Sequence, residues 1–141
     1  LELSALKVKR GVNGATIIDS TYSANPDGVI ADLEYLSLYE GKKVIIMPCL
    51  IELGKASHEA HKRIGEKIAE VCDLAIITTK ECFEDVKEGA GLSGEGQTDK
   101  VVCIEGVQEI LERVKGADVI LLEGGKESRL QRQLVHSLKN D

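Results

Sequence analysis

Short runs of β-branched and other apolar residues alternate with amphipathic stretches along the chain of 141 residues. Runs of this length and composition are typical of strands that are buried on both faces. The alternation therefore predicts an α/β domain in three layers, with a mostly parallel sheet covered by helices on both faces. The expected strands are residues 15–19, 44–47, 74–78, 101–104 and 119–122.

A sixth strand is expected over residues 1–8, which gives a sheet of about six strands. The next strand follows after the short segment 10–14, which closes with Asn13 and Gly14. Asn-Gly is a strong signal for a tight turn between antiparallel strands. We therefore expect the first strand to pair antiparallel at one edge of the sheet.

The expected helices carry apolar residues three and four positions apart, which gives each one an apolar face for the sheet. Asn25 and Pro26 predict an N-cap and a first turn, and Ser57 is predicted to cap the second helix. Residues 81–90 predict a third helix, and the glycine-rich segment 89–98 predicts a solvent-exposed loop. The apolar faces of the first, second, fourth and fifth helices are Ile30, Leu33 and Leu36; Ala60, Ile64 and Ile68; Val107, Ile110 and Val114; and Leu130, Leu134 and Leu138.

The charge balance disfavours two classes of partner. The chain has 18 Lys and Arg against 24 Asp and Glu, a net charge of −6, and only one Phe and three Tyr beside no Trp. An acidic surface with few aromatic residues offers little to nucleic acid or to anionic lipid. Since no apolar run approaches the roughly 20 residues of a bilayer span, we expect no nucleic acid, no membrane, and a cytoplasmic protein.

The four cysteines, Cys49, Cys72, Cys82 and Cys103, form no C-x-x-C pair. We interpret them as free thiols in a reducing compartment. A zinc site or a disulfide pair is the alternative.

Ligands of open parallel sheets bind beyond the carboxyl ends of the strands. The loop after the first parallel strand carries Asp19, several hydroxyl groups and Asn25 before a helix start. An acid there can bind ribose hydroxyls, and helix N–H groups attract anions. The same residue types also build ordinary capped turns. Both interpretations stay open on spacing alone.

The loop after the next strand carries Glu52 among apolar residues, followed by His58 and His61. Their separation of three suits a metal, but no third ligand is evident, so we interpret both as surface or capping histidines. Segment 123–129 is no Walker A loop, because Ile120 and Glu127 occupy positions that need Gly and a hydroxyl. Spacing alone thus predicts a nucleotide- or small-molecule-binding module.

Three segments together resemble a known family. Residues 17–27, I-I-D-S-T-Y-S-A-N-P-D, resemble the I-D-D-x-Y-N-A-N-P motif that opens the C-terminal domain of Mur ligases. Residues 51–54 with Ser57 and His61 are similar to M-L-E-L-G...S...H, and residues 118–129 to D-x-V-L-x-K-G-S-R. The order matches across nearly the whole chain. The resemblance is greatest to the branch that adds D-alanyl-D-alanine.

The resemblance implies that residues 1–141 form the Rossmann-like C-terminal domain of a longer three-domain chain. Its partners would be a central ATPase domain and an N-terminal UDP-sugar domain. The parent enzyme would be an ATP-dependent amide-forming ligase of peptidoglycan precursor synthesis, in which an amine attacks an acyl phosphate. ATP and Mg²⁺ would serve the full-length enzyme, none would be held by this domain alone, and the isolated domain would be inactive.

The resemblance also assigns site residues. Asp19 would hold the ATP ribose, and Tyr22 would line the nucleotide or amine pocket. Asn25 would help to fix the incoming amine or dipeptide. Glu52 and His61 would shape the neighbouring loop at the substrate. The domain itself would supply no catalytic residue and no metal ligand.

Five positions depart from the family motifs. Ser20 replaces an acid, Ser23 replaces an Asn, Pro48-Cys49 replaces Gly-Asp, and Glu123 replaces a Lys. These changes bear on the amine substrate more than on the fold. The alternatives are a folylpolyglutamate- or cyanophycin-type ligase of the same superfamily, and a free-standing nucleotide-binding module.

Overall fold

The computed structural model describes residues 6–23, 25–91 and 100–139. Its sheet has six strands in the order β1-β2-β6-β3-β4-β5, and only the β1–β2 pair is antiparallel. This confirms the predicted α/β class and the antiparallel edge. The strands are β1 (Lys7–Arg10), β2 (Thr16–Ser20), β3 (Lys43–Met47), β4 (Leu74–Ile77), β5 (Val101–Cys103) and β6 (Val119–Glu123).

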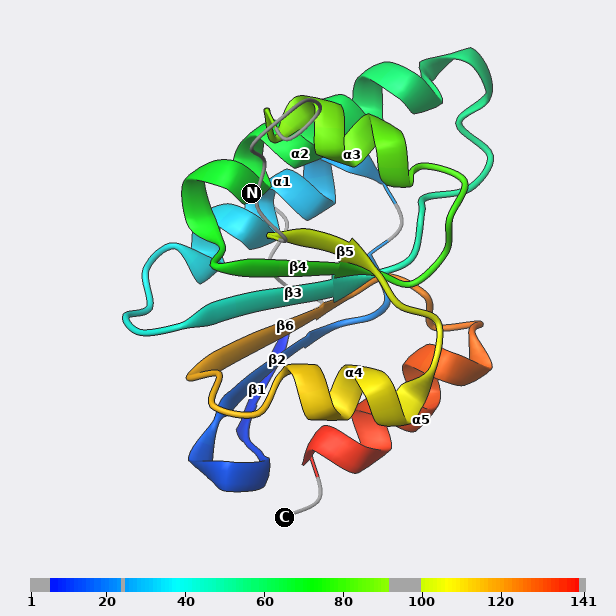
Figure 1. Cartoon of the computed structure of the whole chain (residues 1–141). Helices are drawn as coiled ribbons and strands as arrows, with labels where there is room; N and C mark the ends of the chain where they lie inside the picture. Colours follow the sequence, from blue (N-terminus) through cyan, green and yellow to red (C-terminus); the bar gives the residue numbers. More distant parts are fainter. Residues whose placement is uncertain (1–5, 24, 92–99, 140–141) are drawn as a thin grey trace.

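Helices cover both faces of the sheet, as predicted (Figure 1). One face carries α1, α2 and α3, and the other carries α4 and α5. Two short 3₁₀ helices, η1 (Val12–Gly14) and η2 (Gly54–Ala56), lie in the connections. The helices are α1 (Pro26–Leu36), α2 (Ser57–Val71), α3 (Phe83–Gly89), α4 (Val107–Arg113) and α5 (Arg129–Lys139).

The two faces of the sheet bury separate apolar clusters. Successive strand residues point to opposite faces, so Ile18 and Ile45 pack under α1 to α3 while Ile17 and Ile46 pack over α4 and α5. All four side chains are fully buried. This two-sided burial explains why the central strands are continuous apolar runs.

The connections diverge around β6, which lies between β2 and β3. The chain leaves β2 and β3 toward α1 and α2 on one face, and leaves β6 toward α5 on the other (Figure 1). Loops that turn away from each other leave a crevice at the carboxyl ends of the strands. This topology positions the candidate site.

Two local predictions concern the segment before β2 and the helix α1. Asn13 and Gly14 have φ of 57° and 75°, which confirms the predicted turn. Asn25 is the N-cap of α1, because its side-chain oxygen accepts from the Gly28 N–H at 2.8 Å.

The first strand, however, extends to Arg10 rather than ending at residue 8. Residues 1–5 and 92–98 of the predicted strand and loop lie outside the described residues.

The predicted N-cap at Ser57 is wrong. The preceding residue, Ala56, already has helical backbone angles because η2 leads directly into α2. Ser57 is therefore inside the helix, where its hydroxyl lies 3.2 Å from Nδ1 of His61. Within the described part of the chain, no helix has the length and apolarity needed to cross a membrane.

Candidate functional site

Two adjoining cavities lie beyond the carboxyl ends of the strands. The larger has a volume of about 430 Å³ and the smaller about 220 Å³. Both cavities are lined by the turns after β2 and β6, through Thr21, Tyr22, Gly125 and Lys126. These turns therefore form the boundary between the two cavities. The crevice that the topology predicts is thus present.

The larger cavity combines an apolar wall with a charged rim. Pro48, Leu50 and Ile51 supply apolar surface from the loop after β3. Ile51 is 76% exposed and Tyr22 59%, which makes them two of the four large exposed hydrophobic side chains in the described chain. The charges come from Glu81 after β4 and from Lys126 and Glu127 after β6; Thr79, Ser23 and Ser128 add hydroxyl groups.

Tyr22 and Lys126 contact each other at the boundary between the cavities. The Lys126 ammonium lies 5.0 Å from the centroid of the Tyr22 ring, within the range of a cation–π interaction. The contact holds a positive charge between the two cavities. A ligand carboxylate or phosphate in either cavity would therefore be attracted to the same side chain.

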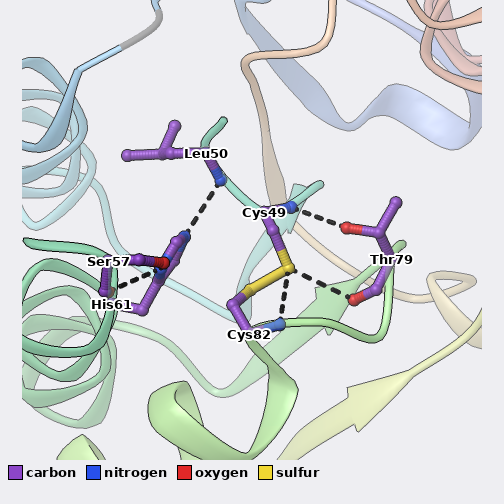
Figure 2. Close-up of a disulfide and its surroundings, with 6 residues drawn as sticks. All are labelled: Cys49, Leu50, Ser57, His61, Thr79 and Cys82. Atoms are coloured by element: carbon purple, nitrogen blue, oxygen red, sulfur yellow. Dashed lines mark hydrogen bonds between the residues drawn. A yellow bond between two sulfur atoms is a disulfide. The ribbon is translucent and has the colours of Figure 1, made fainter. Parts of the chain in front are cut away.

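His61 contacts the apolar wall of the larger cavity from the side of the protein core. Its Nε2 accepts a hydrogen bond from the Leu50 backbone N–H at 2.9 Å, and its Nδ1 lies 2.9 Å from the Ser57 carbonyl oxygen (Figure 2). An imidazole that accepts at Nε2 and donates from Nδ1 is neutral. The ring is fully buried. The interpretation of His61 as a surface or capping histidine is therefore wrong.

His58, by contrast, is a surface histidine, as predicted. Its side chain is 51% exposed, and Nδ1 lies 2.8 Å from the Asp85 carboxylate on α3. The hydrogen bond with Asp85 and the charge of that carboxylate raise the pKa of His58. His58 and His61 thus leave the same helix in different directions and serve different elements.

A disulfide joins Cys49, after β3, to Cys82, before α3 (Figure 2). The Cα atoms are 5.7 Å apart, and the Cys49 N–H donates to the Thr79 hydroxyl at 2.8 Å. Adjacent parallel strands bring these loops together across 33 positions of sequence. The interpretation of all four cysteines as free thiols is wrong for this pair and is confirmed for Cys72 and Cys103.

Asp19 is a buried carboxylate that the protein itself satisfies. It accepts hydrogen bonds from the Thr21 N–H at 3.0 Å and the Thr21 hydroxyl at 2.8 Å, and its other oxygen lies 2.7 Å from the Lys139 ammonium. Burial alone would raise the pKa of Asp19, but the bonds from Lys139 and Thr21 outweigh burial and lower it. Asp19 lines the smaller cavity together with the cations Lys7, Lys126 and Arg132.

Glu123 is a buried carboxyl group of the opposite kind. It ends β6, is fully buried, and has no hydrogen-bond partner for either side-chain oxygen among the described residues. Burial raises the pKa of Glu123 well above its ordinary value, and the neighbouring Asp32 carboxylate raises it further, while Ser23 and Ser20 oppose the shift. The surroundings of Glu123 therefore favour its protonated, neutral form.

The structure brings some of the predicted site residues together and leaves others apart. Asp19 and Tyr22 share the smaller cavity, and Tyr22 also lines the larger. His61 lies behind the wall of the larger cavity. Asn25 and Glu52 are exposed residues of neighbouring loops and line neither cavity, and Glu52 has a φ of 62°, in the left-handed region.

Several lining residues were absent from the predicted set. Ile51, Thr79, Glu81 and Lys126 all line the larger cavity. The available signal was position, because each follows the end of a parallel strand, and the rule that selected Asp19 applies equally to them.

Comparisons with known proteins agree with one another. Residues 6–125 match the family described as Mur ligase, glutamate ligase domain. A UDP-N-acetylmuramoyl-tripeptide–D-alanyl-D-alanine ligase of Haemophilus influenzae is 25% identical over 126 residues, which are 88% of this chain and 27% of that protein. The chain thus spans about a quarter of this curated relative's length.

Solved structures share the fold. A MurF ligase from Thermotoga maritima in complex with ADP is similar with a TM-score of 0.63 and 21% identity, over 94% of this chain and 29% of that one. A MurF structure from Acinetobacter baumannii is similar with a TM-score of 0.72 and 22% identity, over 95% of this chain and 30% of that one.

Proposed function

Because the chain belongs to the Mur ligase, glutamate ligase domain family, we propose that it is the C-terminal domain of an ATP-dependent amide-forming ligase of peptidoglycan precursor synthesis. The similarity to a D-alanyl-D-alanine ligase supports that amine as its substrate. The relative's greater length supports a central ATPase domain and an N-terminal UDP-sugar domain as partners in one chain. The use of ATP favours a cytoplasmic location.

The larger cavity is the proposed site of the incoming amine, and its lining is the observation that carries the proposal. A short dipeptide of small residues has a carboxylate, an ammonium group and two methyl groups. Lys126 can pair with the carboxylate, Glu81 or Glu127 with the ammonium group, and Leu50 and Ile51 offer apolar contact. The volume falls within the range of small-molecule sites.

The proposed role of this domain in the reaction is to position the amine. In an acyl-phosphate mechanism the ammonium group first loses a proton to water, the neutral nitrogen attacks the acyl carbon, phosphate leaves, and the new amide nitrogen loses a second proton to water. Residues that hold the amine in one orientation raise its effective concentration at that carbon. Asn25 and Glu52 lie on loops beside the cavity, and we propose that they reach the amine when the domains close on each other.

The smaller cavity is the proposed contact for the nucleotide. Three cations and the Tyr22 ring suit a ribose or a phosphate group, and a related structure was solved in complex with ADP. Asp19 is proposed to accept ribose hydroxyls with the acceptor capacity that Thr21 and Lys139 leave. The ammonium group bound to Asp19 makes this carboxylate a poor Mg²⁺ ligand. We therefore propose that Mg²⁺ and most phosphate contacts belong to the central domain, and that this domain alone is inactive.

An amine panel tests the proposal. The full-length enzyme that carries this domain is supplied with ATP, Mg²⁺, UDP-sugar tripeptide and one candidate amine, and phosphate release is measured. We expect D-alanyl-D-alanine to give the highest kcat/KM.

Each other outcome contradicts the proposal. In parallel reactions a folate or a growing polymer replaces the UDP-sugar tripeptide. Release driven by glutamate on the folate, or by aspartate or arginine on the polymer, would establish a folylpolyglutamate- or cyanophycin-type ligase. Phosphate release that no amine stimulates would contradict the assignment to an amide-forming ligase.

A further inference from the structure

Three buried groups that can bind metals meet behind the wall of the larger cavity. One ring nitrogen of His61 and the sulfur atoms of Cys49 and Cys82 all lie within 4.8 Å of one another. They come from α2, from the loop after β3 and from the start of α3 (Figure 2). The packed core, rather than sequence proximity, holds them together.

We propose that reduction of the Cys49–Cys82 disulfide converts this cluster into a site for a thiophilic divalent metal such as Zn²⁺. Two thiolates and one imidazole are a donor set that zinc accepts, with a water molecule as the fourth ligand. Cys49 and its neighbour Thr79 line the larger cavity, so water and metal can reach the site from that side.

The orientation of His61 supports the site. Its Nδ1–H faces the Ser57 carbonyl oxygen at 2.9 Å, which fixes the tautomer and leaves the lone pair on Nε2. Metal-binding histidines commonly donate their other ring N–H to a backbone carbonyl in this way. In the disulfide form Nε2 accepts from the Leu50 N–H instead. The metal and the Leu50 N–H therefore compete for one lone pair.

Reduction of the disulfide and binding of the metal are two separate steps. A dithiol gives two electrons and two protons to the disulfide, so that Cys49 and Cys82 become thiols and the dithiol becomes a disulfide. Binding of M²⁺ then displaces the two thiol protons to water. Because the disulfide and the metal each need both sulfur atoms, they exclude one another. Leu50 and Cys49 both line the larger cavity, so the change alters its wall.

The other two cysteines provide an internal control. Cys103 lies on β5 and Cys72 follows α2, and neither belongs to the cluster. Burial raises the pKa of the Cys72 thiol to about 12, which disfavours its thiolate. A metal site that depends on Cys49 and Cys82 is thus distinguishable from adventitious binding to any free thiol.

Cobalt provides a direct test that needs no ligase activity. The purified protein is reduced with a dithiol, freed of reductant without oxygen, and titrated with Co²⁺. We expect one equivalent to produce thiolate-to-cobalt charge-transfer absorption, and Zn²⁺ to abolish it by displacement. The oxidised protein should show none. Absence of this absorption in the reduced protein, or equal absorption in the oxidised protein, would overturn the proposal.

Variants assign the ligands. We expect Cys82→Ser and Cys49→Ser to weaken Co²⁺ binding more than about 100-fold, beyond the loss typical of outer-sphere partners, while Cys103→Ser binds as the parent does. His61→Asn should retain the charge-transfer bands but change the visible bands. Undiminished binding by Cys82→Ser, or its loss in Cys103→Ser, would contradict the assignment. If circular dichroism shows that His61→Asn does not fold, the cysteine variants still decide whether this cluster binds the metal.

Discussion

The surroundings of two buried carboxyl groups near the cavities shift their pKa values in opposite directions. Asp19 is stabilised as a carboxylate by Lys139 and Thr21. Burial and the neighbouring Asp32 carboxylate raise the pKa of Glu123, so the folded protein holds this proton to a higher pH than an exposed glutamate would. Where the family motif has a Lys, this chain therefore has a buried carboxyl group, and Lys126 provides a positive charge at the surface of both cavities.

The raised pKa of Glu123 gives a pH-dependent stability. Folded Glu123 keeps its proton to a higher pH than the unfolded chain, whose ordinary pKa is 4.5. The free energy of unfolding should therefore fall as the pH rises above that value, by at most about 1.4 kcal/mol per pH unit. Glu123→Gln carries no titrating proton, so denaturant unfolding at several pH values should show it gaining stability over the parent as pH rises.

The exposed Glu127 in the turn after β6 is the matched control for this titration. Glu127→Gln should follow the parent protein across the same pH range. A stability difference between Glu123→Gln and the parent that stays constant with pH would show that folded Glu123 has an ordinary pKa.

Asn25 has one observed role and one proposed role, and two substitutions separate them. Asn25→Ala removes the oxygen that caps α1 and should cost about 1 kcal/mol of stability. Asn25→Asp keeps that oxygen but loses the amide N–H₂ donor, so thermal unfolding should change little while the KM for the amine rises in the full-length enzyme. An unchanged KM would leave Asn25 with the capping role only.

At the scale of elements, the sequence predicted the strands well because each central strand is buried on both faces and reads as an apolar run. Asn25-Pro26 was equally informative, since capping is a local interaction. The predicted N-cap at Ser57 was wrong because the 3₁₀ turn η2 precedes it, and no single residue type predicts such a turn. The Cys49–Cys82 pair was missed because it depends on which strands are neighbours, and β3 and β4 are neighbours only once the sheet forms.

The disulfide ties the loop after β3 to α3, and its reduction should loosen both. A cross-link across 33 positions restricts the unfolded chain by roughly 3–4 kcal/mol in the chain-entropy account. Denaturant unfolding with a dithiol and a metal chelator should therefore show a loss of about that size. The Cys49→Ser variant should be insensitive to the dithiol, and Cys72→Ser should respond as the parent does. Equal stability of the oxidised and reduced parent would contradict a structural role for the cross-link.

At the scale of the whole molecule, the site is a consequence of strand order. With β6 between β2 and β3, loops that are distant in sequence meet at the carboxyl ends of the strands. Asp19 and Tyr22 were predictable because their motif is contiguous. Lys126, Glu81 and Ile51 also follow the ends of parallel strands, but the strand order is needed to show that their loops meet at one site.

The central claim is that the larger cavity receives the amine, and one matched pair of substitutions tests it most directly. Ile51 is 76% exposed at the cavity, and Leu38 is 77% exposed in the connection that precedes β3, at the opposite end of the strands. Both can become Ser with little effect on stability. In the full-length enzyme, we measure KM for the amine and for ATP in Ile51→Ser and Leu38→Ser.

Loss of about 1 kcal/mol of apolar contact with the substrate should raise the amine KM of Ile51→Ser about fivefold, with the ATP KM unchanged. Leu38→Ser should behave as the parent enzyme. An amine KM in Ile51→Ser equal to that of Leu38→Ser, or a rise confined to the ATP KM, would contradict the assignment of this cavity to the amine.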